Sequence, residues 1–264
     1  MQARRVDCGP VRDGARDISD DISDDISDDI SDDISDAAAF ARERLGFLPD
    51  AQQELVLRGG RRGIVNCTRQ WGKSTVTAAK AVHRAYSAAG SLTLVVTPGA
   101  RRSGEFLRKA ETFVRRLGIK VRGDGCNEMS IAFPNGSRIV GLPGNETTVR
   151  GFSAVSLMLI DEAARVEDEF YRAVRPMLAV GDGDLWLMST PDGKRGFFWE
   201  EWERGEEAWE RISVGAPECP RISARFLEEE RAKGDATYRQ EYLCEFVDQE
   251  GAVFSRELIE GMFA

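Results

Sequence analysis

Short apolar runs alternate with longer amphipathic stretches along most of the chain. The runs show little polar alternation, a pattern typical of strands that are buried on both faces. They are residues 63–66, 92–96, 157–160 and 185–188. The stretches between and after them have helical composition or periodicity, and they are residues 73–88, 99–117, 167–178 and 197–204. This alternation predicts an α/β fold in which helices flank a mostly parallel sheet on both sides.

The remaining segments add smaller elements at both ends of this core. Residues 37–45 and 50–57 are expected short helices, and 129–133 and 137–142 flank Pro134-Asn135-Gly136, which predicts a hairpin. After residue 208 the chain becomes acidic and helix-rich, with helices expected at 223–233 and 236–242 and a strand at 244–247. We therefore expect a core at 37–207 followed by a helical subdomain or junction at 208–250.

The net charge of −9 comes from one segment. Residues 17–36 are five tandem copies of Asp-Ile-Ser-Asp, whose ten aspartates leave the other 244 residues at +1. Because the aspartates repel one another and the isoleucines form no straight helical stripe, residues 1–36 are expected to be a disordered, acidic, low-complexity segment. An expanded repeat without function is the favoured explanation; a tail that mimics DNA or binds a basic partner is the alternative.

Composition narrows the class of protein and its chemistry. The apolar runs are too short to cross a bilayer and no signal-peptide core opens the chain, so we expect no membrane association and a location in the cytoplasm. The five cysteines form no CxxC pair, which argues against a disulfide framework or a thiolate zinc site. With a single histidine, His83, any metal site must depend mainly on carboxylates and hydroxyls.

The sharpest local motif is the segment Cys67-Thr68-Arg69-Gln70-Trp71-Gly72-Lys73-Ser74-Thr75, between an expected strand and an expected helix. Backbone N–H groups of such a loop converge on phosphate oxygens, and the following helix adds its positive N-terminal end. Lys73 can reach the β- and γ-phosphates of a nucleotide, and the Ser74 hydroxyl can bind Mg²⁺. Cys67 occupies the position of the first glycine in the usual GxxxxGK[ST] pattern, so on this segment alone an ordinary loop and helix start remains the alternative.

A second motif completes the expected site. The apolar run 157–160 ends in Asp161 and Glu162, where Asp161 can bind Mg²⁺ and Glu162 can orient and deprotonate the attacking water. Alone, this pair would more often be a helix N-cap. Together with a phosphate-binding loop in one α/β domain, it predicts a P-loop ATPase that uses ATP and Mg²⁺.

At this point the sequence resembles the ATPase domain of the terminase large subunits of tailed bacteriophages. The resemblance covers about residues 47–254 and includes the loop variant in which an arginine, here Arg69, precedes GK[ST]. It implies that Gln53 recognises adenine and that Ser189 and Thr190 sense loss of the γ-phosphate. It also implies catalytic arginines: Arg69 within the subunit, and Arg150 reaching a neighbour's ATP. The residue-level alternatives are ion pairs for the arginines, a turn cap for Ser189 and Thr190, and a solvated helix position for Gln53.

The resemblance also implies partners and a wider context. It implies a homo-oligomeric ring that moves double-stranded DNA, together with a phage portal and a small terminase subunit. In the family a nuclease domain follows, so residues 251–264 are expected to begin a linker to a missing nuclease domain, and no residue here is assigned to DNA cleavage. A helicase-like DNA-dependent ATPase and an inactive prophage remnant that at most binds nucleotide are the alternative functions.

The expected helix 99–117 carries basic residues opposite its apolar face. They recur at seven-residue spacing and are Arg101, Arg102, Arg108, Lys109, Arg115 and Arg116. This face can contact a DNA backbone or the acidic segment 198–250 of a neighbouring subunit. A solvated helix face is an equally good explanation.

Overall fold

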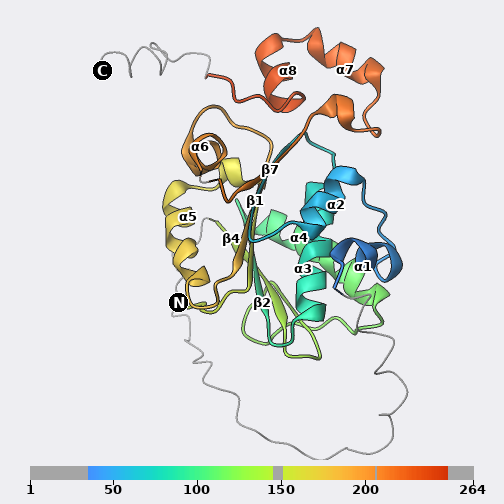
Figure 1. The fold of residues 1–264 in the computed structure, drawn as a ribbon, viewed down its shortest axis with the longest axis vertical. Coiled ribbons are helices and arrows are strands. Elements are labelled where there is room, and N and C mark those ends of the chain that lie inside the picture. The colour runs from blue at the N-terminus through green and yellow to red at the C-terminus, as the bar shows by residue number, and fades with distance from the viewer. Residues whose placement is uncertain (1–34, 145–150, 206, 249–264) are drawn as a thin grey trace, which may run out of the picture.

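A seven-stranded sheet forms the centre of the computed structural model, which describes residues 35–144, 151–205 and 207–248 (Figure 1). The strand order is β3-β4-β2-β5-β6-β1-β7, and every pairing is parallel except that of β3 with β4. The strands are β1 (Arg62–Cys67), β2 (Leu92–Thr97), β3 (Ser130–Ala132), β4 (Arg138–Pro143), β5 (Leu157–Asp161), β6 (Asp184–Ser189) and β7 (Glu210–Val214). The mostly parallel α/β sheet predicted from the sequence is confirmed.

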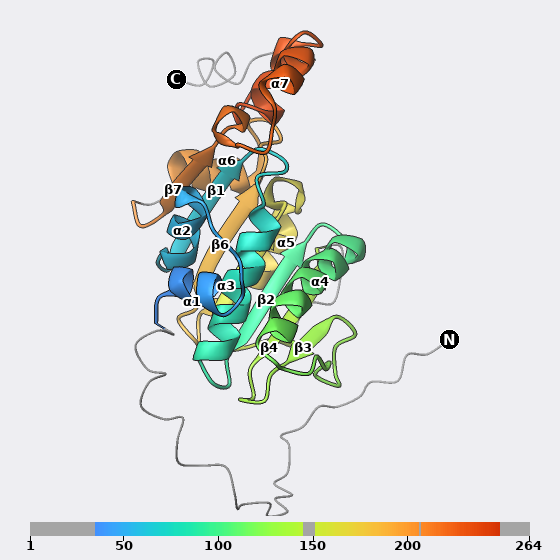
Figure 2. The ribbon, with the colours of Figure 1, turned by 90° about the vertical axis from the view of Figure 1, so that its right-hand side faces the viewer.

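Helices cover both faces of the sheet, as expected for strands that are apolar throughout. One face carries α1 (Ala37–Glu43), α2 (Ala51–Arg58), α3 (Lys73–Ser87) and α4 (Ala100–Arg116), which lie in front of the strands in Figure 2. The other face carries α5 (Asp168–Val174), the 3₁₀ turn η2 (Arg175–Leu178) and α6 (Gly196–Arg204). Along β1, Ile64 packs toward the second layer and Val65 toward the first. Both faces of the central strands are therefore core.

The register brings the ends of three strands together. Asn66 of β1 pairs with Ser189 of β6, while Met188 pairs with Asp161 of β5. Strand β6 thus lies between the loop that follows β1 and the acidic end of β5. In a parallel sheet, loops that leave this carboxyl edge are the usual place for a site.

Two helices lie beyond that edge rather than on a face of the sheet. These are α7 (Ala224–Arg231) and α8 (Asp235–Glu241), at the top of Figure 1, with a small cluster of Ala216, Leu227 and Tyr238 between them and the 3₁₀ turn η3 (Ala216–Glu218). The Thr68 hydroxyl donates to the Glu241 carbonyl at 2.9 Å, so the end of α8 is attached to the loop after β1.

Two predictions about the last part of the chain are wrong at the level of secondary structure. Residues 244–247 form no strand, and β7, within the stretch expected to be helical, joins the sheet as an edge strand beside β1. The sequence of β7 alternates because only Ile212 and Val214 are buried, so it lacks the continuous apolar signal of the inner strands. The expected boundary at 207/208 therefore falls before a strand of the core sheet.

The last aspartate of the acidic repeat is part of the fold. Asp36 accepts a hydrogen bond from the Ala38 amide at 2.9 Å and so caps α1. Its two oxygens also accept from Arg58 at 3.0 and 2.9 Å, at the end of α2. The folded part therefore begins before residue 37; the rest of the repeat, residues 17–34, lies outside the described residues.

A buried lysine joins α2 to α3. The Lys80 ammonium donates to the carbonyls of Val56, Leu57 and Gly59 at 2.9, 3.2 and 3.0 Å, and it lies 4.5 Å from the ring centroid of Trp186. Burial lowers the pKa of Lys80 to about 8. Its three donors satisfy carbonyls at the end of α2 that a helix terminus would otherwise leave unpaired.

None of the helices within the described ranges is long and apolar enough to span a membrane.

Candidate active site

The loop between β1 and α3 is shaped by its backbone. Gly72 has a φ of 105° and Gln70 a φ of 67°, both in the left-handed region, so the chain turns sharply before α3 begins at Lys73. A Cβ on Gly72 would lie 3.0 Å from the Gln53 amide nitrogen, which explains why a glycine stands here. Cys67 is fully buried, and burial raises the pKa of its thiol to about 12. It therefore packs as a neutral side chain, where the usual motif has a glycine.

The two predicted halves of the site face each other. The Ser74 hydroxyl donates to Asp161 Oδ2 at 2.7 Å, and Lys73 Nζ lies 3.0 Å from Glu162 Oε1. Both contacts border a cleft of about 470 Å³, whose lining includes Gln53, Gly72, Lys73, Ser74, Thr75 and Glu162. Lys73 and the acidic strand end thus lie on opposite sides of a space large enough for a nucleotide's phosphates, as the sequence predicted.

Glu162 holds an unusual backbone conformation and several charged partners. Its φ of 56° and ψ of 42° place it in the left-handed region directly after β5, a strained position for a residue with a side chain. Besides Lys73, its carboxylate contacts Arg165 at 2.8 Å and Arg102 at 3.5 Å. Burial opposes its ionisation, but the charges of Lys73, Arg102 and Arg165 outweigh burial and hold the pKa of Glu162 below its usual range. Glu162 is therefore a carboxylate at neutral pH.

Asp161 and Ser74 form an oxygen-only pair that fits a magnesium ion. Asp161 is only 6% exposed, and burial raises the pKa of its carboxyl against the opposing charge of Lys73 and the hydrogen bond from Ser74. Mg²⁺ binds through one or two protein oxygens and completes its octahedron with phosphate oxygens and water. A serine hydroxyl and a carboxylate at 2.7 Å from each other match that donor set. Among the described residues no group of three or more His, Cys, Asp and Glu side chains forms a metal cage, so the ion would depend on the nucleotide as well.

Ser189 and Thr190 connect the two halves behind the cleft. The Thr190 hydroxyl donates to the Cys67 carbonyl at 3.0 Å, and the Ser189 hydroxyl accepts from the Ala164 amide at 3.2 Å. Both residues are fully buried. Since Ala164 belongs to the turn η1 (Ala163–Arg165) that follows Glu162, the end of β6 bridges the loop after β1 and the segment after β5. Their role in sensing the γ-phosphate stays a prediction.

Gln53 lies at the far end of the cleft and is only 1% exposed. Its amide nitrogen donates to the Trp71 carbonyl at 3.1 Å, and its amide oxygen accepts from the Asp50 amide at 3.0 Å in a capping box of α2. It is thus a buried helix-capping residue and not a solvated one. Its part in adenine recognition stays a prediction.

The structure separates the two predicted arginines. Arg69 lines the cleft, and its guanidinium pairs with Glu241 of α8 at 2.6 Å, so it shows both the predicted location and the predicted alternative of an ion pair. Arg150 lies outside the described residues, and its role as a finger stays a prediction.

Sequence reasoning missed three charged residues around the cleft. Arg221 lines it and donates to the Trp71 carbonyl, and Arg165 lies between Glu162 and Glu241, 3.7 Å from the latter. Arg221 and Glu241 come from the segment after β7, some 150 to 170 residues from the loop they contact, and no local motif marks them. Arg165 stands three residues after Glu162, a spacing that brings side chains together on a helical turn, and this was the one available signal.

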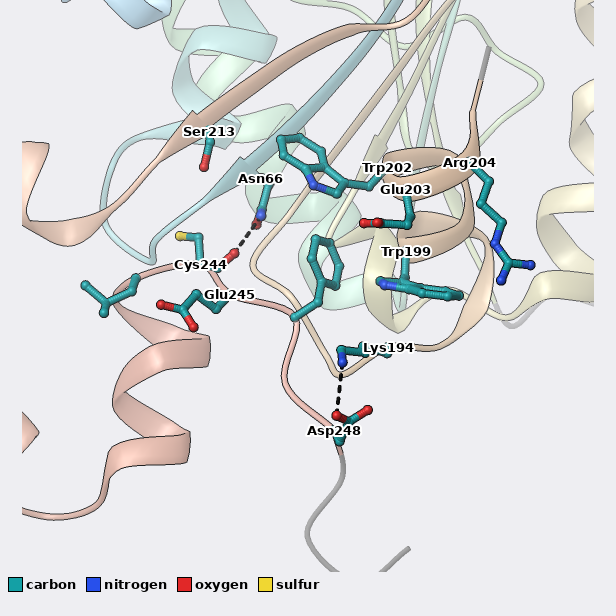
Figure 3. Close-up of a pocket in the computed structure, with 12 residues that line it drawn as sticks. Asn66, Lys194, Trp199, Trp202, Glu203, Arg204, Ser213, Cys244, Glu245 and Asp248 are labelled. Carbon is teal, nitrogen blue, oxygen red and sulfur yellow. Dashed lines mark hydrogen bonds and ion pairs between the residues drawn. The ribbon is translucent and has the colours of Figure 1, made fainter. Parts of the chain in front are cut away.

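A larger hollow lies on the other face of the sheet and contains none of the predicted site residues. It has about 790 Å³ and lies between α6 and the segment 243–248 (Figure 3). Asn66 donates there to the Cys244 carbonyl at 2.7 Å, and Lys194 pairs with Asp248 at 3.0 Å. Trp199 and Trp202 of α6 form its apolar wall (Figure 3). We call this hollow the α6 groove.

Comparison with known proteins gives consistent results. The ATPase domain of the Thermus phage P74-26 large terminase superposes with a TM-score of 0.68 at 21% identity, covering 79% of this chain and 97% of that domain. The HK97 bacteriophage large terminase superposes with a TM-score of 0.61 at 15% identity, covering 88% of this chain and 52% of that one. A large terminase from a thermophilic bacteriophage in complex with ADP gives a TM-score of 0.64 at 16% identity, covering 79% and 57%. This chain therefore spans about half the length of the longer structures.

The family comparison identifies the chain more directly than these folds do. No curated protein matches its sequence. The family model described as terminase large subunit, T4likevirus-type, N-terminal, matches residues 64–260, which is well over half of the chain. The protein therefore belongs to the terminase large subunit family, in the part that corresponds to the N-terminal ATPase region.

Proposed function

We propose that this chain hydrolyses ATP with Mg²⁺ and converts the energy into movement of double-stranded DNA, as the ATPase part of a phage packaging motor. The observation that carries the proposal is the cleft in which Lys73 and Ser74 face Asp161 and Glu162. Related large terminases have been solved in complex with ADP and with ATP-γ-S, which supports a nucleotide as the ligand. A homo-oligomeric ring, a portal and a small subunit are proposed as partners on family grounds.

The contacts in the cleft describe a resting arrangement. Lys73 pairs with Glu162 at 3.0 Å, and that pair has to separate when the ammonium binds the β- and γ-phosphates. Glu162 is then free to accept a hydrogen bond from the attacking water and to take its proton. When bound, Mg²⁺ would be held by Ser74 and Asp161 and would neutralise developing charge on the phosphates. Arg69 likewise has to leave Glu241 before its guanidinium can contact phosphate.

ATP hydrolysis measured with and without linear duplex DNA tests this function. Wild-type protein should release phosphate, faster with DNA, and Lys73→Ala should remove that activity. Lys120→Ala is the matched control, because Lys120 is an exposed lysine outside the cleft. Equal rates for Lys73→Ala and Lys120→Ala would contradict the assigned chemistry.

A further inference from the structure

The basic residues of α4 form two rows with different surroundings. Seven-residue spacing places Arg101, Arg108 and Arg115 in one row, which we call the outer row, and Arg102, Lys109 and Arg116 in the other, the inner row. The outer row contacts only its own helix: Arg101 pairs with Glu105, Arg108 donates to the Gly104 carbonyl, and Arg115 pairs with Glu111. It behaves as a solvated helix face.

The inner row instead contacts other parts of the protein. Arg116 donates to the carbonyls of Leu45 and Gly46 in the connection between α1 and α2, with the Gly46 contact at 3.0 Å. Arg102 Nη1 lies 3.5 Å from Glu162 Oε2, and Lys109 lines the nucleotide cleft together with Lys73, Ser74 and Thr75. The row therefore runs along one side of the site.

The start of α4 is fixed to the sheet, which sets the position of this row. Thr97, the last residue of β2, and Ser103, in the first turn of α4, join their buried hydroxyls at 2.9 Å. Strand β2 pairs with β5, with Val96 opposite Ile160, so α4 starts beside the strand end that carries Asp161 and Glu162. At the other end of the helix, the rings of Phe113 and Phe47 are 6.0 Å apart, and Phe47 also lines the cleft.

Lys109 differs from the other cations around the cleft because it has no counter-ion. Lys73 and Arg69 pair with carboxylates, and Arg221 donates to a carbonyl, whereas Lys109 makes no hydrogen bond or ion pair with any residue in the described part of the chain. An ammonium group at the wall of a phosphate-sized cleft is positioned for an anionic ligand. The bound nucleotide is the anion that this cleft is proposed to take.

We propose that the inner row of α4 is a wall of the nucleotide site, in which Lys109 binds phosphate oxygens of the nucleotide and Arg102 is a positioning residue for Glu162. The inference rests on the proposed function for the identity of its ligand. Once Lys73 moves to the phosphates, Arg102 and Arg165 remain on Glu162 Oε2 and keep the carboxylate oriented. The outer row has no part in this site.

Nucleotide affinity tests Lys109 against its neighbour Arg108. For Lys109→Gln, the dissociation constants of Mg-ATP and Mg-ADP should rise roughly tenfold, the effect of losing one charge-assisted contact, while that of adenosine stays unchanged. Lys109→Arg should keep most of the affinity, and Arg108→Gln should stay within about twofold of wild type. The inference about Lys109 is overturned if Lys109→Gln binds ATP as tightly as Arg108→Gln, or if adenosine binding falls equally.

Steady-state kinetics tests Arg102 against its neighbour Arg101. Arg102→Gln should lower kcat several-fold with little change in KM for ATP, and Arg102→Lys should restore part of it, because the effect acts through the orientation of Glu162. Arg101→Gln is the matched control. Equal kcat values for Arg102→Gln and Arg101→Gln, or a loss confined to KM, would overturn the positioning role.

The two levels of the proposal can fail separately. A wild-type protein that binds ATP without hydrolysing it contradicts the proposed ATPase function, yet the Lys109 and Arg108 affinities still decide whether α4 is a wall of the site. Without turnover, Arg102 is judged by a thermal-unfolding cycle of Arg102→Gln and Glu162→Gln. A coupling between them, absent for Arg101→Gln and Glu162→Gln, supports the contact, and no coupling overturns it.

Discussion

The nucleotide cleft and the α6 groove start from adjacent residues of the same strand and differ in almost every property. Asn66 at the end of β1 points into the groove, while the loop that begins at Cys67 encloses the cleft. The groove is larger, at about 790 Å³ against about 470 Å³, but its walls are aromatic and its charges are paired within it. In the cleft, a lysine, a serine and two carboxylates converge from two strand ends. Convergent charge, and not volume, therefore locates the chemistry in this molecule.

The strongest test of this comparison is removal of the carboxylate of Glu162. Glu162→Gln should lower the ATPase rate about 10²- to 10⁴-fold, the range for loss of a general base, while ATP still binds. Glu167→Gln, an exposed glutamate five residues later, is the matched control and should keep the wild-type rate. Single-turnover phosphate release measures both, and a normal rate in Glu162→Gln would place the chemistry elsewhere.

The groove should respond in the opposite way. Phe246 packs there against Phe198 and Trp202, with ring centroids 5.9 and 6.1 Å apart. Phe246→Ala should lower the free energy of unfolding by about 2 kcal/mol, below the range for a fully buried phenylalanine because this ring is only partly buried, and it should leave kcat unchanged. Urea unfolding and ATP hydrolysis measured together decide the point. A large loss of turnover in a still-folded Phe246→Ala protein would make the groove part of the active machinery.

An intermediate case is Glu241, which lies outside the cleft but contacts one of its arginines. Because Glu241→Gln removes the charge that holds Arg69 and keeps the size of the side chain, Arg69 should be freer to reach phosphate, and KM for ATP should fall about two- to threefold. Glu230→Gln, another glutamate of the same two-helix segment, should leave KM unchanged. An increase of KM in Glu241→Gln would show that the pair supports the site rather than competing with the nucleotide.

The smallest expected effect concerns a charge far from both hollows. Asp36→Ala should cost about 1 kcal/mol of stability through loss of the α1 cap, whereas Asp36→Asn keeps the cap and loses only the pairing with Arg58. The hydrogen bond from Arg58 is the main reason that the pKa of Asp36 falls from 3.8 to about 2. A depressed carboxyl pKa adds stability that is complete above pH 3.8 and is lost as the pH falls toward 2. Thermal unfolding of wild type and Asp36→Asn between pH 2 and 6 should therefore converge only at the acidic end.

Much of the fold was predictable because the inner strands carry an unbroken apolar signal. Residues 92–96, 157–160 and 185–188 all became strands, and the Pro134-Asn135-Gly136 turn joins an antiparallel pair. Strand β7 was missed because an edge strand buries only alternate residues. The last repeat aspartate was assigned to a disordered segment, since a helix cap at that position depends on one residue that is identical to nine others.

The site was predictable where its residues follow strands and unpredictable where they arrive from elsewhere. Lys73, Ser74, Asp161 and Glu162 each stand directly after a strand of one parallel sheet, so their meeting follows from topology. Arg102 and Arg221 approach from a helix face and from the segment after β7, and only packing brings them there. The equal spacing of the basic residues on α4 likewise did not distinguish its two rows.

The clamp made by Lys80 fixes one dimension of the motor. Because it locks the helix that bears Gln53 to the helix that begins at Lys73, the two ends of the nucleotide pocket form one rigid block whose length stays constant through a catalytic cycle. Movement that follows hydrolysis then has to take place at the opposite boundary, where α8 meets the phosphate loop through the partly exposed pair of Arg69 and Glu241. The force-transmitting joint of this subunit is therefore expected at an ion pair that salt can weaken, and not at its buried core.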